Sequence, residues 1–318
     1  MKKRLLILMF ILAAALCFAA CGKEAETQEG RTEEENSVEN IITVGEKGAT
    51  EDEIMFYMLC IKEKYEGYFG KDIWDVSFGK KTFLDMCKDD VLGEIVQLKV
   101  ITAKAEELGI VVTEDEVEEI ADTVRQQMDE INDEDKARYH ITTELLEKIY
   151  HDNYLSSKTF DVVTADVNTS VSDEQARVAS FEVLTLNYEP SGRQEVLLKA
   201  DELQKQAAAE GTDFYSLATV HSNEPEIQYT IPEGVMEKAF DRAAFSLKTG
   251  EISGVIVGDE KCYIVHCINE LDEDETAENK EKIINERQTE AFKKVYEGWA
   301  KDYGVKVDEE KWKEINMN

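Results

Sequence analysis

The feature that most restricts the fold is the order of segments within residues 178–269. The run VASFEVLTL at residues 178–186, rich in β-branched and aromatic residues, predicts a strand. A helical pattern at 195–210 follows, and short tracts at 213–218 and 234–247 come next. The run CYIVHCI at 262–268 predicts a closing strand. The rest of the chain is organised around this order of strand, helix, short helices and strand.

Charge limits the partners of the chain. Its 318 residues permit two modest domains or one large one, and 42% of them are hydrophobic, which is enough for real cores. Lysine and arginine number 36 against 69 aspartates and glutamates, a net charge of −33. A surface this acidic repels phosphate backbones, so we expect no nucleic-acid partner. It also repels anionic lipid headgroups, so any membrane attachment must have another source.

The N-terminus supplies such a source. Lys2, Lys3 and Arg4 precede an apolar stretch at residues 5–16, which predicts a signal peptide over residues 1–20. The next residues, FAACG at 18–22, resemble a bacterial lipobox, although Phe18 stands where leucine is commoner. The resemblance implies that Cys21 becomes the lipidated N-terminal residue and anchors the protein on the extracytoplasmic face of the cell membrane. The alternative is a plain signal peptide followed by an incidental cysteine.

A helical region follows the N-terminal segment. Residues 21–40 are acidic and lack aromatics, so they predict a disordered tether. Order begins with a short strand at 41–45, and Thr50 with Glu53 predicts a capping box. Helices are predicted at 82–108, after a cap at 113–116, at 143–150 and around 154–163. All three prolines lie beyond this part, which places a domain boundary within 164–172.

The C-terminal segment predicts another helix at 276–303. Phe292, Tyr296 and Trp299 belong to an aromatic stripe at helical spacing, which we expect to pack on other helices. The strand-like run at 305–307 can pair with residues 43–44. The simplest architecture is therefore a helical domain built from residues 41–170 and 272–318, with residues 171–271 inserted as a separate domain.

The inserted block resembles the parvulin-type peptidyl-prolyl isomerases. The resemblance rests on its element order and on the pattern G-x-M-x-x-x-F-x-x-A-x-F, which runs from Gly234 to Phe245. The order of lipobox, helical half, parvulin block and closing helix is similar to PrsA-type foldase lipoproteins and SurA-type extracytoplasmic chaperones. This resemblance implies an α+β fold, with an all-helical chaperone domain and an inserted parvulin-like α/β domain.

The parvulin resemblance also implies a proline-binding site. Met236 and Phe240 fall on the family's proline-pocket positions, with Phe245 behind them, although plain core packing would place such residues too. Phe181 and Tyr263 stand where the family has its two histidines. The loop position of the family's cysteine or aspartate carries Glu224. The predicted substrate-binding residues are Phe181, Met236, Phe240, Phe245 and Tyr263. The predicted substitute catalytic residues are Glu224 and Tyr263.

Cysteines and histidines show no metal or redox motif. No C-x-x-C or Cys/His metal spacing occurs, so we expect neither a metal nor a cofactor. Cys262 and Cys267 should lie on opposite faces of one strand and cannot pair, whereas a Cys60–Cys87 disulfide stays open. His266 is three residues after Tyr263 and should face the other side of its strand.

Three functions fit these patterns. The first is a membrane-anchored extracytoplasmic chaperone for unfolded or newly secreted polypeptides, whose parvulin-like domain binds proline segments without isomerising them. The second is an active peptidyl-prolyl cis-trans isomerase that uses a substitute polar cluster. The third is a scaffold or assembly lipoprotein with one fixed partner.

Overall fold

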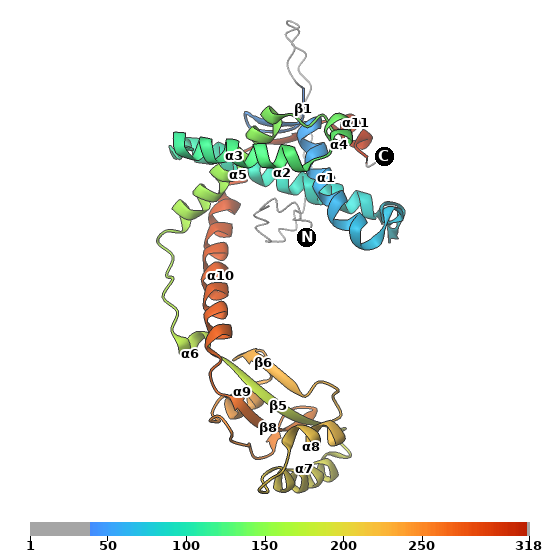
Figure 1. Cartoon of the computed structure of the whole chain (residues 1–318), viewed down its shortest axis with the longest axis vertical. Helices are drawn as coiled ribbons and strands as arrows, with labels where there is room; N and C mark the ends of the chain where they lie inside the picture. The colour runs from blue at the N-terminus through green and yellow to red at the C-terminus, as the bar shows by residue number, and fades with distance from the viewer. Residues whose placement is uncertain (1–38, 317–318) are drawn as a thin grey trace, which may run out of the picture. The chain divides into compact units, whose positions relative to one another are not determined.

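The computed structural model describes residues 39–316 and divides into two units (Figure 1). One, the helical unit, contains the described residues up to Val167 and those from Thr289 onward. The other, the inserted unit, is Asn168–Gln288. The helix α10 (Glu273–Trp299) passes from the second unit into the first. The predicted signal peptide, Cys21 and nearly all of the tether lie outside the described residues.

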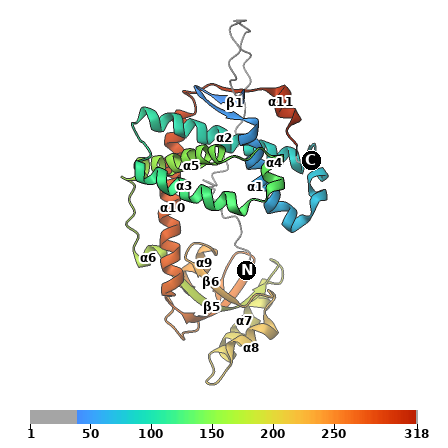
Figure 2. The same cartoon turned by 45° about the horizontal axis from the view of Figure 1, so that its top comes forward.

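The helical unit has more elements than its sequence pattern predicts. Its helices are α1 (Glu51–Phe69), η1 (Lys71–Asp75), α2 (Phe83–Glu107), α3 (Glu114–Glu130), α4 (Asp133–Arg138), α5 (Thr143–Thr164), the end of α10 and α11 (Glu309–Glu314). Its strands are β1 (Asn40–Val44), β2 (Lys47–Thr50), β3 (Ser77–Phe78), β4 (Lys81–Thr82) and β9 (Val305–Val307). Helix α5 packs against both α2 and α3 (Figure 2).

Helix α5 is continuous, whereas the sequence predicted two helices with a break near residues 151–153. The polar residues there do not interrupt the backbone, because their side chains have hydrogen-bond partners within α5 and on α2. Asn153 donates to the carbonyl of Ile149 at 2.8 Å, and Asp152 accepts from Lys99 at 2.7 Å. A polar run without glycine or proline is therefore compatible with one long helix.

The two ends of the chain meet in one sheet. Its strand order is β2-β1-β9, and Thr43 lies opposite Lys306 in the antiparallel pair of β1 and β9. The predicted pairing of residues 305–307 with 43–44 is thus confirmed. The packing of the aromatic stripe is also confirmed, since Phe292 and Tyr296 are each 1% exposed and Phe292 lies 5.2 Å from the ring of Phe160.

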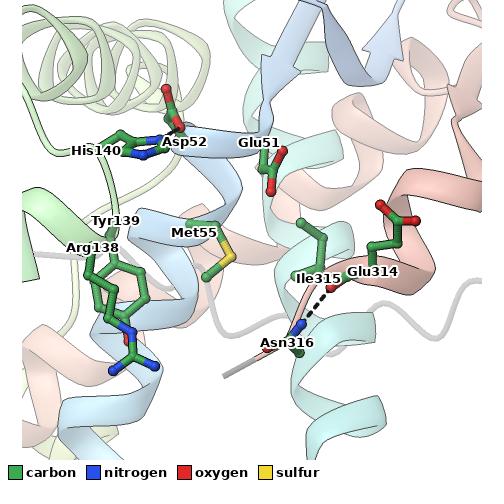
Figure 3. Close-up of a pocket in the computed structure, with 9 residues that line it drawn as sticks. All are labelled: Glu51, Asp52, Met55, Arg138, Tyr139, His140, Glu314, Ile315 and Asn316. Atoms are coloured by element: carbon green, nitrogen blue, oxygen red, sulfur yellow. Dashed lines mark hydrogen bonds and ion pairs between the residues drawn. The ribbon is translucent and has the colours of Figure 1, made fainter. Parts of the chain in front are cut away.

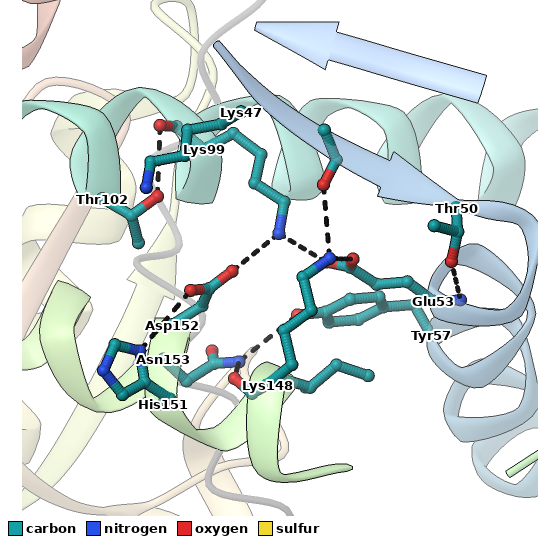
Figure 4. Close-up of polar contacts among 12 residues, drawn as sticks. Lys47, Thr50, Glu53, Tyr57, Lys99, Thr102, Lys148, His151, Asp152 and Asn153 are labelled. Carbon is teal, nitrogen blue, oxygen red and sulfur yellow. Dashed lines mark hydrogen bonds and ion pairs between the residues drawn. The ribbon is translucent and has the colours of Figure 1, made fainter. Parts of the chain in front are cut away.

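A buried ionic network joins α1, α2 and α5 (Figure 4). The Lys99 side chain is 1% exposed, and its Nζ lies 2.6 Å from Glu53 Oε1 and 2.7 Å from Asp152 Oδ2. The other oxygen of Glu53 accepts from Lys148 at 2.6 Å. Burial alone would lower the pKa of Lys99, but the two carboxylates outweigh it and leave that pKa raised. The ammonium of Lys99 therefore stays charged inside the core.

This network corrects one detail of the predicted cap at Thr50. The Thr50 side chain does accept from the backbone N–H of Glu53, at 3.3 Å. The carboxylate of Glu53, however, contacts Lys99 and Lys148 rather than returning to the helix start. The predicted cap at Thr113 is reciprocal, because the carboxylate of Glu116 accepts from the Thr113 N–H at 2.7 Å. Only the second motif is a complete capping box.

The inserted unit is a four-stranded antiparallel sheet with helices on both faces. Its elements before α10 are α6 (Asp173–Ala176), β5 (Val178–Asn187), α7 (Arg193–Ala207), α8 (Phe214–His221), β6 (Gln228–Pro232), α9 (Lys238–Ala244), β7 (Ile256–Val257) and β8 (Lys261–Asn269). The strand order is β6-β5-β8-β7. Together with the helical unit, this confirms the predicted α+β fold class.

Alternation along β8 divides the inserted unit into two cores. Cys262 and Ile264 pack with residues of α7 and α8, whereas Tyr263, Val265 and Cys267 pack with residues of α9. The predicted placement of Cys262 and Cys267 on opposite faces is confirmed. Both are thiols, as are Cys60 and Cys87.

The start of α10 belongs to the inserted unit, although the sequence placed the second domain boundary before this helix, at residue 271. The backbone N–H of Val178 donates to the Thr276 hydroxyl at 3.0 Å. Asn279 donates to the carbonyl of Ala176 at 2.9 Å. These contacts attach the first turns of α10 to the start of β5.

Within residues 39–316, no helix combines the length and the hydropathy that a membrane span requires.

Candidate functional site

The predicted proline-pocket residues come together on the α9 face of the inserted sheet. The ring of Phe240, on α9, lies 6.1 Å from that of Phe181, on β5, and 5.3 Å from that of Tyr263, on β8. Phe245 lies 5.2 Å from Phe181. All three pairs are edge-to-face, the arrangement that aromatic quadrupoles favour. Met236 packs against this cluster from the loop before α9.

Burial separates these residues into a floor and a rim. Phe181 and Phe240 have no exposed surface, and Phe245 and Tyr263 are almost fully buried. Met236 and Tyr229 are half-buried and reach solvent above them. Phe181 therefore fills the position where the parvulin resemblance expects a histidine.

The polar side of the site is centred on Glu237, which the sequence did not single out. The Tyr263 hydroxyl donates to Glu237 Oε1 at 2.5 Å, and the backbone N–H of Asp259 donates to Glu237 Oε2 at 3.1 Å. Nearby, Tyr188 donates to the carbonyl of Gly258 at 2.5 Å. An acidic residue just before a helix is common for dipole reasons alone, so the sequence carried no sign of this role.

Tyr263 is a fixed donor and not a proton-transfer group near neutral pH. Burial and then the hydrogen bond to Glu237 raise the pKa of Tyr263 well above its ordinary value. Its phenol therefore stays protonated under physiological conditions. The hydroxyl proton of Tyr263 is therefore already engaged in the hydrogen bond to Glu237.

Glu224 and Tyr263, the two predicted catalytic substitutes, do not form a pair. Glu224 Oε1 accepts from Lys261 Nζ at 3.0 Å, while Tyr263 is bonded to Glu237. His266 lies on the other face, as the sequence predicted, where its Nδ1 is 2.9 Å from Glu182 Oε2 and its ring contacts Phe214. The structure therefore assembles the apolar half of the predicted site without its polar half.

A second concavity lies in the helical unit (Figure 3). It has a volume of about 170 Å³. It is lined by Glu51, Asp52, Met55, Arg138, Tyr139, His140, Glu314, Ile315 and Asn316. His140 has a φ of 49° and its Nδ1 lies 3.0 Å from Asp52 Oδ1. Among residues 39–316, no group of three His, Cys, Asp or Glu side chains is placed to hold a metal ion, here or elsewhere.

The Gly258→Ala variant tests the Glu237 contact. A Cβ at this position would lie 2.0 Å from Glu237 Oε1, so the carboxylate must move and release Tyr263. Loss of a hydrogen bond to a charged group predicts about 1.5–3 kcal/mol of destabilisation. The pKa of Tyr263, followed by phenol titration, should fall toward that of an ordinary tyrosine, because Glu237 helps to raise it.

Gly254→Ala is the matched control, because a Cβ there meets no atom within 4 Å. It should change neither the stability nor the Tyr263 titration. An unchanged titration in Gly258→Ala would show that Glu237 does not control Tyr263.

The comparisons with known proteins define the class of this chain. Residues 1–160, half of the sequence, match the family described as SurA-like N-terminal domain. Residues 183–269 match the PPIC-type PPIASE domain. The chain therefore belongs to the SurA-like family, and it is a foldase of the PrsA/SurA type with a parvulin-like domain.

Individual relatives carry the name Foldase protein PrsA. The one from Caldanaerobacter subterraneus subsp. tengcongensis is 29% identical over 269 residues, which cover 80% of this chain and 78% of the relative. The one from Clostridium botulinum strain Hall is 23% identical and covers 96% of this chain and 98% of the relative. A solved structure of the peptidylprolyl isomerase PrsA from Bacillus cereus is 17% identical, with a TM-score of 0.38, and covers 77% of this chain and 97% of that one.

Proposed function

We propose that this protein is a lipid-anchored extracytoplasmic chaperone whose parvulin-like domain holds proline-containing segments without isomerising them. The main observation behind this proposal is that buried aromatic side chains fill the floor of the site. Phe181 has no exposed surface where a polar group is expected, and Tyr263 is committed to Glu237. The exposed parts of the rim, Met236 and Tyr229, supply an apolar surface for a proline ring.

Catalysis would require more than this surface. The barrier to rotation about a peptide bond is about 18–20 kcal/mol, because the C–N bond has partial double-bond character. A catalyst must bind the twisted amide more tightly than the planar one. Holding a proline ring stabilises both forms alike, so binding without acceleration is the expected outcome.

The location and the clients in this proposal rest on the sequence and on the relatives. The lipobox-like segment ending at Cys21 supports the anchor, and the relatives named as foldases support a role in folding exported chains. The net charge of −33 favours clients with basic segments and disfavours nucleic acid.

Two measurements test the holding function. We expect no acceleration of cis-trans isomerisation in Xaa-Pro peptides, and suppression of aggregation of an unfolded secreted protein at stoichiometric amounts. Met236→Ala should weaken the binding of proline peptides, because it removes the exposed apolar rim. The matched control is Val235→Ala, whose side chain is 60% exposed and lies outside the buried cluster.

The contrary outcomes identify the alternatives. A rate above background that falls in Met236→Ala would make the protein an active isomerase. Absence of aggregation suppression would remove the chaperone role. Recovery of one stoichiometric partner in a pull-down, instead of a spread of secreted chains, would favour a scaffold.

A further inference from the structure

The helical unit carries an aromatic lobe, defined here as residues 65–86. It consists of the last turn of α1, the short helix η1, the β3–β4 hairpin and the start of α2. In Figure 1 it is the blue region beyond the end of α1, where the chain turns back toward α2. Tyr68, Phe69 and Phe78 are 69%, 65% and 54% exposed. Among residues 39–316, the next most exposed Phe, Tyr or Trp side chain is Tyr215, at 45%.

The exposed rings stand on a packed aromatic base. Phe83 contacts Tyr65 at 5.0 Å, Trp74 at 5.5 Å and Phe78 at 6.2 Å between ring centroids. Trp74 is buried, and its indole N–H donates to Glu66 at 2.8 Å. The lobe is therefore a structured projection, so holding its outer rings in water is a permanent cost of the fold.

Two of the exposed rings, Phe69 and Phe78, lie next to turns, and Tyr68 lies in the last turn of α1. Phe69 and Phe78 each precede a glycine in the left-handed region, with φ of 77° at Gly70 and 71° at Gly79. A Cβ at either glycine would meet nothing within 4 Å, so open space surrounds both turns. A peptide-binding site is usually concave, whereas aromatic tips suit a soft interface that deforms around them.

The charge of the lobe also differs from that of the chain. It is close to neutral, while the whole sequence carries −33. Its charged residues are Lys71, Lys80 and Lys81 against Glu66, Asp72, Asp75 and Asp85, a net charge of −1. Lys81 is paired with Asp89 of α2. The lobe can therefore approach an anionic lipid surface with little of the repulsion that the rest of the protein would experience.

The length of chain before the structure permits such an approach. An extended chain spans at most about 3.3–3.6 Å per residue, so the residues between Cys21 and residue 39 reach no farther than about 65 Å. The lobe lies at the far end of α1, whose 19 residues extend about 28 Å at 1.5 Å per residue. An anchor at Cys21 thus allows the lobe to touch the same membrane.

We propose that the aromatic lobe inserts Tyr68, Phe69 and Phe78 into the headgroup region of the membrane that carries the anchor. This inference rests on the proposed lipidation of Cys21. Aromatic rings partition favourably into the membrane–water interface, and the near-neutral charge of the lobe limits its repulsion by anionic lipids. The lobe is a second membrane contact that orients the helical unit on the bilayer.

Tryptophan quenching in vesicles tests the insertion. The full lipidated chain is reconstituted into vesicles of phosphatidylcholine and phosphatidylglycerol, with or without bromine on the acyl chains near the headgroups. We expect brominated lipid to quench the emission of Trp74, and Trp74→Phe should lose this quenching. In the double variant Phe69→Ser/Phe78→Ser, quenching by the brominated lipid should fall to the level seen in Trp74→Phe. The control Tyr215→Ser/Val220→Ser, exposed on α8, should remain quenched like the unaltered protein.

The possible outcomes test the lipid anchor and the insertion of the lobe separately. A chain that does not float with the vesicles rejects the anchor and this proposal with it. A chain that floats with unquenched Trp74, or with quenching unchanged in Phe69→Ser/Phe78→Ser, rejects only the insertion. If Trp74 is unquenched and the double variant instead loses aggregation suppression, the lobe is a client-binding surface and the proposal is wrong.

Discussion

Lys99→Met is expected to destabilise the helical unit by about 3–5 kcal/mol, the usual cost of removing one partner from a buried ion pair. The loss has a specific cause. Without the ammonium, Asp152 loses its 2.7 Å contact and Glu53, which is fully buried, keeps only Lys148. Site-resolved hydrogen exchange of α1, α2 and α5 is the appropriate measurement, because two units need not unfold as one.

The loss of stability in Lys99→Met should also depend on pH. The pKa of Lys99 is raised in the folded state, so its contribution is fully present below the unfolded pKa of about 10.4 and is lost as the pH rises through the folded value. The difference between the protein and Lys99→Met should therefore be constant from about pH 7 to 9 and shrink at more alkaline pH.

Lys294→Met is the matched control for this network. Lys294 pairs with Glu290 at 2.8 Å one turn away on α10, and both side chains are exposed. Such an exposed pair is screened by solvent and contributes little to stability. If Lys99→Met cost no more than this control, the buried network would not stabilise the unit.

Phe240→Ala should have an effect of similar size in the inserted unit. Phe240 is fully buried between Phe181 and Tyr263, and a large-to-small change at such a site costs about 3–5 kcal/mol. We expect faster hydrogen exchange in β5 and β8, with no change in α2 of the helical unit. Binding of proline peptides should also fall, because Met236 loses the floor on which it packs.

Val220→Ala controls for changes in the same unit that leave its core intact. Val220 is 74% exposed, and surface changes of this kind stay within about 0.5 kcal/mol. A peptide affinity that stays normal in Phe240→Ala while stability falls would separate the proline niche from the aromatic core and contradict the proposed floor-and-rim arrangement.

Local patterns predicted much of the fold because they report local physics. The alternation of β8 placed Cys262 and Cys267 on opposite faces, and the spacing of Phe292 and Tyr296 predicted a buried helix face. The pairing of β1 with β9 was also predicted, since short apolar strands at the two ends needed partners. The short elements β6 and β7 were missed, because such pieces gain their hydrogen bonds only from strands distant in sequence.

The sequence predicted which apolar side chains pack together around Phe240, while their role in binding proline stays a prediction. The spacing from Met236 to Phe245 predicted the aromatic cluster, because it combines helical periodicity with a family pattern. Glu237 was missed because its partners, Tyr263 and Asp259, belong to a strand and a turn more than twenty residues away. The role of Lys99 was invisible for the same reason, since a lysine in an amphipathic helix is ordinarily solvated.

The pairing of β1 with β9 has a consequence for biogenesis. A chain that emerges N-terminus first presents β1 long before its neighbour β9 exists. Phe160 likewise lacks its packing partner Phe292 until the whole parvulin-like insertion has been synthesised. The insertion can acquire its sheet early, as domains generally fold in units during synthesis. The helical unit, although it is made first, is completed last.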